Sequence, residues 1–155
     1  MRRETTRKLT LLSLLTGLTL VLGSYFKLPT GNGVTTLLDV GIFFTAFYLG
    51  RTEGAIVGGL SAFLFDLLAG YPQWMFISLL AHGIQGYFAG FSGKKRIVGL
   101  VAATVLMVGI YFLASSLMYG VVAASADLVT NIMQNVVGIV GAYFLYIGLS
   151  KVKER

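Results

Sequence analysis

Side chains that could bind a solute recur at helical spacing in three otherwise apolar segments of the sequence. Within each segment, steps of three or four residues place the polar and aromatic members on one face of a helix. These residues are Trp74, Ser78, His82 and Gln85 in the first segment, Tyr111, Ser115 and Tyr119 in the second, and Asn131, Gln134 and Asn135 in the third. If the three faces meet, they enclose a cavity whose floor lies near His82 and Asn135.

The chemistry of these side chains is neutral and aromatic. Amides and hydroxyls supply hydrogen-bond donors and acceptors without charge, while indole and phenol rings supply flat apolar walls. Such a lining favours a small, largely uncharged heteroaromatic solute. It suits a strongly anionic ligand or a metal ion poorly, because neither a basic cluster nor a cage of carboxylates accompanies it. We therefore expect no metal site.

A purely structural role is the alternative for each of these residues. Asparagine and glutamine in membrane helices often bond to neighbouring helices, and Trp74 stands where an interfacial aromatic residue is expected in any case. His82 would be satisfied as a neutral residue by Gln85. The sequence leaves open whether three carboxylates brace loops or touch the solute; they are Asp39, Asp66 and Asp127.

Signatures of catalysis are absent from the sequence. There is no phosphate-binding Gly-x-x-x-x-Gly-Lys motif, so ATP hydrolysis by that machinery is excluded. One histidine and no cysteine argue against a catalytic zinc. No serine accompanies a His/Asp pair in a recognisable pattern. We expect a protein that is not an enzyme and needs no cofactor.

The elements that position these side chains follow from composition. Of 155 residues, 56% are hydrophobic and 12% are charged, about half the charged fraction of a soluble domain; the mean hydropathy is +0.83. Apolar runs recur from about Leu9 to Leu149, which predicts one membrane domain over residues 1–155. The net charge of +6 comes from short basic clusters between those runs, a distribution that argues against nucleic acid as a partner.

The hydropathy pattern predicts an all-α integral membrane bundle of six transmembrane helices. About 20 residues are needed to span the bilayer core. The helices are expected at about residues 9–26, 37–50, 54–69, 72–91, 97–119 and 127–149. The first is interpreted as a retained span instead of a cleaved signal peptide. Pro72 is placed at the start of the fourth helix, and residues 27–39 are expected to fold over the outer surface.

The distribution of lysine and arginine predicts the orientation. With both termini in the cytoplasm, every basic residue among the twelve except Lys27 falls on the inner side. An even number of helices is required for both ends to share a side. The sequence thus predicts a multi-pass membrane protein with its N- and C-termini in the cytoplasm.

Small residues spaced by four indicate where helices approach closely or meet a partner. Gly54 and Gly58 form one such pair, and Gly86 and Gly90 form another. The Ser13-x-x-x-Gly17 sequence lies on a strongly apolar first helix, so we expect Ser13 and Gly17 to face a partner subunit.

Four segments of the chain resemble the substrate-binding (S) components of energy-coupling factor (ECF) transporters, in the riboflavin-transporter-like branch. They are residues 39–50 (DVGIFFTAFYLG), 54–60 (GAIVGGL), 66–74 (DLLAGYPQW) and 80–90 (LAHGIQGYFAG). The resemblance implies a receptor in the plasma membrane of a prokaryote that binds a vitamin or vitamin precursor. Such a receptor works with a transmembrane coupling protein (the T component) and two cytoplasmic ATPases. The resemblance also implies a ligand in the outer half, roofed by the first loop and flanked by the last three helices.

The chain departs from the family pattern at two places. Ser13 and Gly17 stand where relatives often have two alanines on the first helix. His82 and Gln85 stand where relatives often have lysine and glutamate, an exchange expected to remove a potential charge pair.

The function expected from these observations is uptake of a small vitamin-like solute. Hydroxymethylpyrimidine or a pyridoxine-like B6 vitamer fits a neutral, aromatic lining, and riboflavin fits less well. Two alternatives are a stand-alone channel or secondary transporter and a membrane scaffold without transport, in which the polar faces only join helices.

Overall fold

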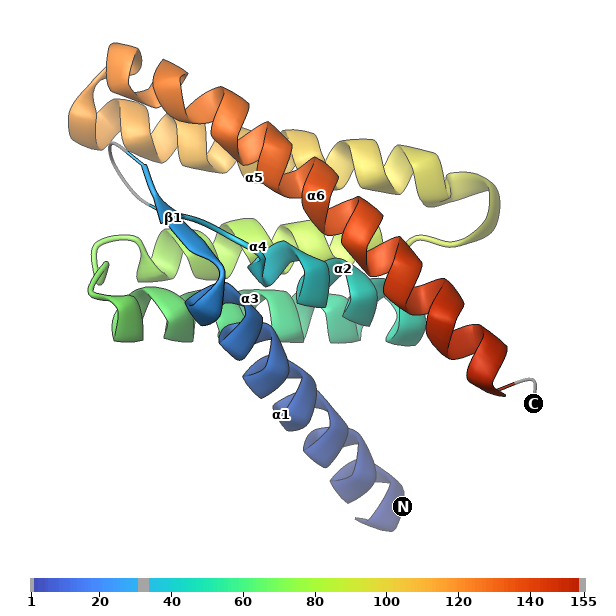
Figure 1. Cartoon of the computed structure of the whole chain (residues 1–155). Helices are drawn as coiled ribbons and strands as arrows, with labels where there is room; N and C mark the ends of the chain where they lie inside the picture. The colour runs from blue at the N-terminus through green and yellow to red at the C-terminus, as the bar shows by residue number, and fades with distance from the viewer. Residues whose placement is uncertain (1, 31–33, 154–155) are drawn as a thin grey trace.

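The computed structural model describes residues 2–30 and 34–153 and is almost entirely helical (Figure 1). Its elements are α1 (Arg2–Tyr25), β1 (Lys27–Pro29), β2 (Val34–Thr36), α2 (Leu38–Leu49), α3 (Arg51–Ala69), α4 (Met75–Ala89), the 3-10 turn η1 (Gly93–Lys95), α5 (Arg96–Tyr119) and α6 (Val121–Lys153). The expected membrane bundle of six helices is confirmed.

The helices are of two kinds by length. In the part of the chain that the structure describes, α1, α3, α5 and α6 are long and apolar enough to cross a membrane. With 12 and 15 residues, α2 and α4 measure roughly 18 and 22 Å, which is less than a bilayer core. Helix α2 begins at Leu38, so it does not extend back through Thr35 and Thr36, which belong to β2.

Several predicted helix boundaries were wrong. The first helix begins at Arg2 instead of Leu9, and the last begins at Val121 instead of Asp127. Hydropathy marks the apolar part of a helix, whereas hydrogen bonding continues into its polar ends. The fourth helix begins at Met75, after a turn in which the Trp74 amide donates to the Tyr71 carbonyl at 2.9 Å; Pro72 therefore precedes the helix.

A short hairpin stands where the sequence predicted an irregular loop. Strands β1 and β2 are antiparallel, with Lys27 opposite Thr36 and Pro29 opposite Val34. Its base is closed by a hydrogen bond from the Leu37 amide to the Phe26 carbonyl at 3.1 Å. Strands of three residues are too short to show a period of two in the sequence, so the pattern gave no sign of them.

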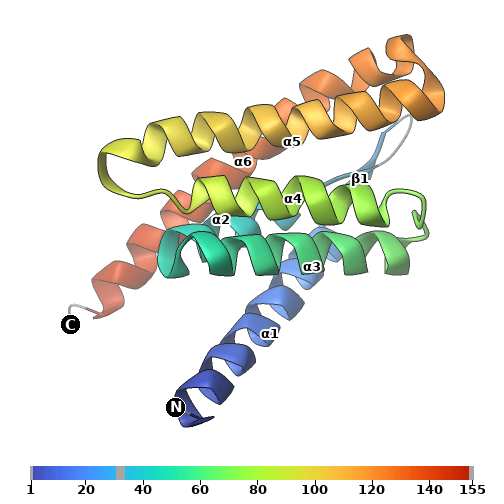
Figure 2. The same cartoon turned by 180° about the vertical axis from the view of Figure 1, so that it is seen from behind.

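The helices surround α2. One side of α2 packs against α3 and the other against α6, with α1 and α4 also in contact. Figure 1 shows α5 and α6 above the α3–α4 pair, with α2 in front of that pair, and Figure 2 shows the α3–α4 pair in front of α2. Both chain ends lie at one end of the bundle, as expected for an even number of helices, and the hairpin lies at the other. We call the hairpin end the outer end.

The core lies along α2, which is buried over most of its length. Ile42 and Phe43 are fully enclosed, and Ala46 is nearly so. Two apolar clusters meet here, one toward α3 through Ile42 and one toward α6 through Phe43. A polar residue on α2 is therefore held at the centre of the bundle, away from lipid.

Close approach of α3 and α4 depends on glycine. A Cβ atom on Gly54 would lie 2.6 Å from the Gly86 carbonyl oxygen, and one on Gly86 would collide with the Gly54 carbonyl group. One turn along, a Cβ on Gly58 would strike the His82 carbonyl oxygen. These contacts are the close helix packing that the small-residue spacing predicted, and they fix the position of His82 on α4.

Candidate functional site

A cavity lies at the outer end, between the hairpin and helices α3 to α6. The volume open to the centres of water molecules is about 60 Å³. Its lining residues are Thr30, Val34, Thr35, Thr36, Leu38, Ala62, Phe65, Asp66, Tyr71, Trp74, Ser78, His82, Tyr111, Ser115, Asp127, Thr130, Asn131 and Gln134. Polar and aromatic groups from five elements thus face one space.

The structure brings seven of the ten predicted site residues to this cavity. They are Trp74, Ser78, His82, Tyr111, Ser115, Asn131 and Gln134. The other three lie outside the lining: Tyr119 packs against Trp74 at 6.0 Å between ring centroids, while Gln85 and Asn135 are fully buried behind the cavity wall.

Aromatic rings form one wall. The centroids of Trp74 and Tyr111 lie 5.7 Å apart, and His82 stands edge-on to Tyr111 at the same distance. The Tyr111 hydroxyl and the Ser78 Oγ share a hydrogen bond of 2.6 Å, which fixes the plane of the phenol ring. Rings separated by 4.5–7 Å attract one another, so this wall is held in place without a ligand.

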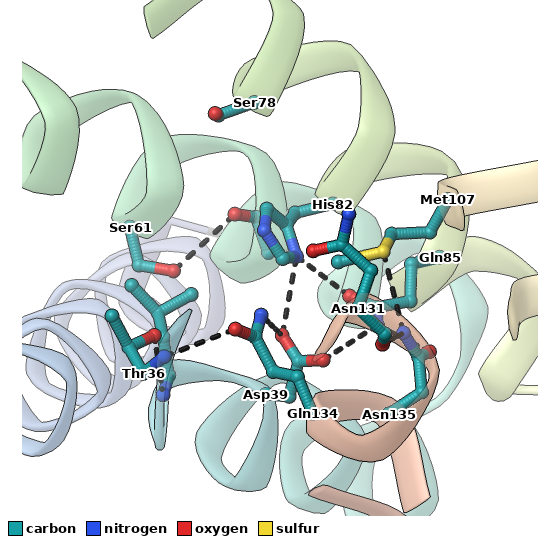
Figure 3. Close-up of polar contacts among 12 residues, drawn as sticks. Thr36, Asp39, Ser61, Ser78, His82, Gln85, Met107, Asn131, Gln134 and Asn135 are labelled. Atoms are coloured by element: carbon teal, nitrogen blue, oxygen red, sulfur yellow. Dashed lines mark hydrogen bonds and ion pairs between the residues drawn. The ribbon is translucent and has the colours of Figure 1, made fainter. Parts of the chain in front are cut away.

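A network of hydrogen bonds around Asp39 forms the floor (Figure 3). Asp39 is fully buried on α2. Its Oδ2 accepts from the Gln85 Nε2 at 3.0 Å, and its Oδ1 accepts from the Gln134 Nε2 at 3.2 Å. The His82 Nδ1 lies 3.3 Å from the same Oδ1. A buried carboxylate requires such partners, and α4 and α6 supply all three.

The geometry assigns the proton on His82. Gln85 uses its Nε2 to donate to Asp39 and, at 2.8 Å, to the Asn135 Oδ1. Its Oε1 must therefore accept, and the atom that it faces at 2.7 Å is the His82 Nδ1. The Nδ1 of His82 consequently carries a hydrogen. Asn135 completes the set by donating to the Asn131 carbonyl at 3.0 Å.

The floor is also tied to the hairpin. The Gln134 Oε1 accepts a hydrogen bond of 3.0 Å from the Thr36 backbone amide, while its Nε2 donates to Asp39. The Thr36 side chain in turn accepts from the Leu38 amide at 3.2 Å. One side chain of α6 therefore links the strand above the cavity to the carboxylate below it.

Sequence reasoning did not identify Asp39 as the centre of the site. The exchange that placed His82 and Gln85 on α4 was expected to remove a charge pair, yet α2 places a carboxylate beside that histidine. The signal was present, since a carboxylate inside an apolar helix is a functional candidate by default. Asp66 and Asp127, also left open, both line the cavity.

Metal ligands do not gather in the described ranges 2–30 and 34–153: no group of three or more His, Cys, Asp or Glu residues there is arranged to hold an ion.

The predicted docking residues lie far from the cavity on α1. Ser13 and Gly17 are both exposed, and a Cβ atom on Gly17 would meet nothing within 4 Å. Leu14 and Leu18 next to them are also exposed, at 59% and 53%. This face of α1 is apolar, small at its centre and uncovered by the rest of the chain.

Comparison with known proteins agrees with this architecture. Residues 3–151 match the family model of the ECF-type riboflavin transporter, S component. The chain is 47% identical over 148 residues to the thiamine precursor transporter HmpT of Lactococcus lactis, covering 94% of this chain and 89% of that protein. It is also 29% identical over 119 residues to an uncharacterized protein of Pyrococcus woesei, covering 73% and 80% of the two chains.

The fold has a solved counterpart. A structure described as the S component of a bacterial ECF transporter superposes with a TM-score of 0.79, covering 97% of this chain and 99% of that one, at 24% identity. The fold and its four long apolar helices define a multi-pass membrane protein with a cavity at its outer end. The chain belongs to the family of ECF-type transporter S components. It is a transport component of the plasma membrane, as the sequence led us to expect.

Proposed function

We propose that this chain captures a water-soluble vitamin or vitamin precursor, with the thiamine precursor hydroxymethylpyrimidine as the best candidate and a pyridoxine-like B6 vitamer as the second. The observation that carries the proposal is the cavity at the outer end, in which aromatic rings and hydrogen-bonding side chains surround a small volume. The similarity to the thiamine precursor transporter HmpT supports the same class of solute.

The chemistry of the lining supports a small aromatic ring. Trp74 and Tyr111 offer apolar faces on which a flat ring can pack. Ser115, Asn131 and the Asp39 network offer donors and acceptors around its edge. With about 60 Å³ open to water centres, the cavity favours a single ring over the three fused rings of a flavin.

Uptake would need partners, because the sequence has no ATP-binding motif of its own. We expect a T component and two cytoplasmic ATPases to supply the energy, as the family implies. The exposed face of α1 around Ser13 and Gly17 is the proposed contact with the T component. A small side chain at its centre lets the backbone of a partner helix approach closely.

The single tryptophan of the chain lines the cavity and provides a direct measurement. Titration of the purified protein with hydroxymethylpyrimidine, pyridoxine or riboflavin should change Trp74 fluorescence at micromolar concentration or below for the true solute. If none of the three bound, the proposal would be wrong. Uptake into liposomes by the chain alone, without ATPases, would instead support the alternative of a self-sufficient transporter.

A further inference from the structure

One acceptor in the cavity has no partner. The Asp66 Oδ2 is buried and makes no hydrogen bond within the described part of the chain, and the Asp66 residue as a whole is only 6% exposed. Two other buried side-chain atoms share this property, Arg51 Nε and Ser116 Oγ, but neither residue lines the cavity. Asp66 does. The unsatisfied acceptor is therefore located where a solute would sit.

Two residues close to Asp66, Tyr71 and Ser78, make hydrogen bonds that leave the Asp66 Oδ2 without a donor. The Asp66 carbonyl accepts from the Tyr71 amide at 2.8 Å, which closes the turn after α3. Ser78 on α4 shares a hydrogen bond of 2.6 Å with Tyr111 and also lies close to the Asp66 carboxylate, but the Asp66 Oδ2 itself receives no donor from the described residues. A buried carboxylate oxygen without a donor is unfavourable, and the low dielectric around it strengthens any hydrogen bond that it does form. What remains to be supplied is a donor.

We propose that the Asp66 Oδ2 accepts a hydrogen bond from an amino group on the solute. The receptor would then select heteroaromatic rings that carry an exocyclic amino group. This inference rests on the proposed function and narrows it. An amino group conjugated to an electron-poor ring donates and scarcely accepts, so it matches an oxygen that can only accept. An aminopyrimidine has this group, whereas the pyridoxine ring carries hydroxyl groups instead.

The test compares two ligands of equal shape. One is hydroxymethylpyrimidine with its amino group, and the other is the same molecule with a methyl group in its place. A lost hydrogen bond to a charged group should weaken binding of the methyl analogue by roughly 10- to 100-fold in the unchanged protein. Equal binding of the two ligands would overturn the proposal.

Two variants test whether the difference in binding between the two pyrimidines depends on Asp66. Asp66→Leu removes the acceptor at similar shape and should bring the ratio of the two dissociation constants close to one. Ser116→Ala is the matched control, because the Ser116 Oγ is also buried without a partner in the described part of the chain, but Ser116 does not line the cavity. The ratio should persist in the control. A ratio that changed in Ser116→Ala and not in Asp66→Leu would overturn the assignment to Asp66.

The outcomes separate this inference from the function on which it rests. If the unchanged protein bound both pyrimidines equally, the receptor function would stand and the role of Asp66 would fall. If it bound neither, both would fall. Circular dichroism of Asp66→Leu shows whether its helices are intact. If they are lost, Asp66→Asn is used in place of Asp66→Leu. A reduced ratio of the two dissociation constants is then expected, and an unchanged ratio would contradict the proposal.

Discussion

Asp39 shows what a polar side chain needs when it lies at the centre of a membrane protein. Neither lipid nor bulk water can satisfy it there, so each of its oxygens must find a donor within the chain. Gln85 and Gln134 supply one amide donor each, and His82 supplies a ring nitrogen. The residues belong to three helices, so the carboxylate joins them into one unit.

Asp39→Asn should destabilise the protein by about 1–3 kcal/mol. The new amide would turn an acceptor into a donor in front of two amide donors. Reversible unfolding in detergent with increasing denaturant would measure the loss. Asp127→Asn is the control, since Asp127 is only partly buried, whereas Asp39 is fully buried; an equal loss in both variants would contradict the central role of Asp39.

Trp74→Ala should weaken solute binding by about tenfold or more, because a face of the ring wall would be lost. Since the tryptophan is also the fluorescent probe, calorimetry should measure the affinity. Phe76→Ala is the matched control, because Phe76 lies two residues further on, in the first turn of α4, but its side chain is 64% exposed. Similar losses in both variants would show that the effect comes from the helix and not from the cavity.

The spacing of polar residues predicted part of this arrangement. Periodicity placed Ser78, His82 and Gln85 on one face of α4, and that face does turn inward. Periodicity could not predict which of these side chains reach the cavity: His82 lines it, whereas Gln85 lies behind its wall. Asp39 was not identified as their partner because it comes from a separate helix, and a single sequence carries no sign of which helices become neighbours.

At the scale of elements, hydropathy predicted the number and order of helices because each apolar run must be shielded from water. It did not predict where α4 begins, because the turn at Tyr71–Trp74 is set by local hydrogen bonds. Nor did it predict β1 and β2, whose pairing depends on contacts with the rest of the chain. The hairpin is the element that closes the cavity, so this omission matters for function.

Gln134→Leu should loosen the hairpin, because the Thr36 amide would lose its acceptor on α6. We expect hydrogen exchange at Thr36 to accelerate and the solute to dissociate faster, by about 3- to 10-fold for one neutral hydrogen bond. Exchange measured by mass spectrometry and dissociation measured by stopped flow would test this. Met133→Leu, at the exposed neighbouring position, should change neither rate; unchanged exchange in Gln134→Leu would exclude the link.

Gly86→Leu should disrupt the α3–α4 pair, because a side chain there would collide with the Gly54 carbonyl group. Overpacking of this kind costs about 1–3 kcal/mol, and the displaced α4 should also lose solute binding. Gly109→Leu is the control, since a Cβ at Gly109 meets nothing within 4 Å. Thermal unfolding in detergent should separate the two variants, and equal melting temperatures would contradict the role of close packing.

The whole molecule separates its two proposed contact surfaces. The cavity lies at the outer end, whereas the uncovered face of α1 runs toward the end where both termini lie (Figure 1). At that end Lys8 of α1 forms an ion pair with Glu53 of α3, which holds α1 against the bundle. A change on this face of α1 should therefore leave the cavity intact.

Gly17→Leu should block assembly with the T component and ATPases while leaving solute affinity unchanged. A Cβ atom at Gly17 meets nothing within 4 Å and the position is exposed, so we expect the added side chain to clash only with a partner. Co-purification of the complex measures assembly, and Trp74 fluorescence measures binding. Gly109→Leu again serves as control, and full assembly of Gly17→Leu would contradict the proposed docking face.

The hydrogen-bonded floor beneath the cavity has a thermodynamic consequence for so small a ligand. Its amides and imidazole are immobilised when the chain folds, so their rotational freedom has already been lost before any encounter takes place. A ligand with few atoms has little contact area with which to compensate for ordering a loose site. Preorganisation thus permits tight capture of a single ring, and the association step should show an unusually small loss of side-chain entropy.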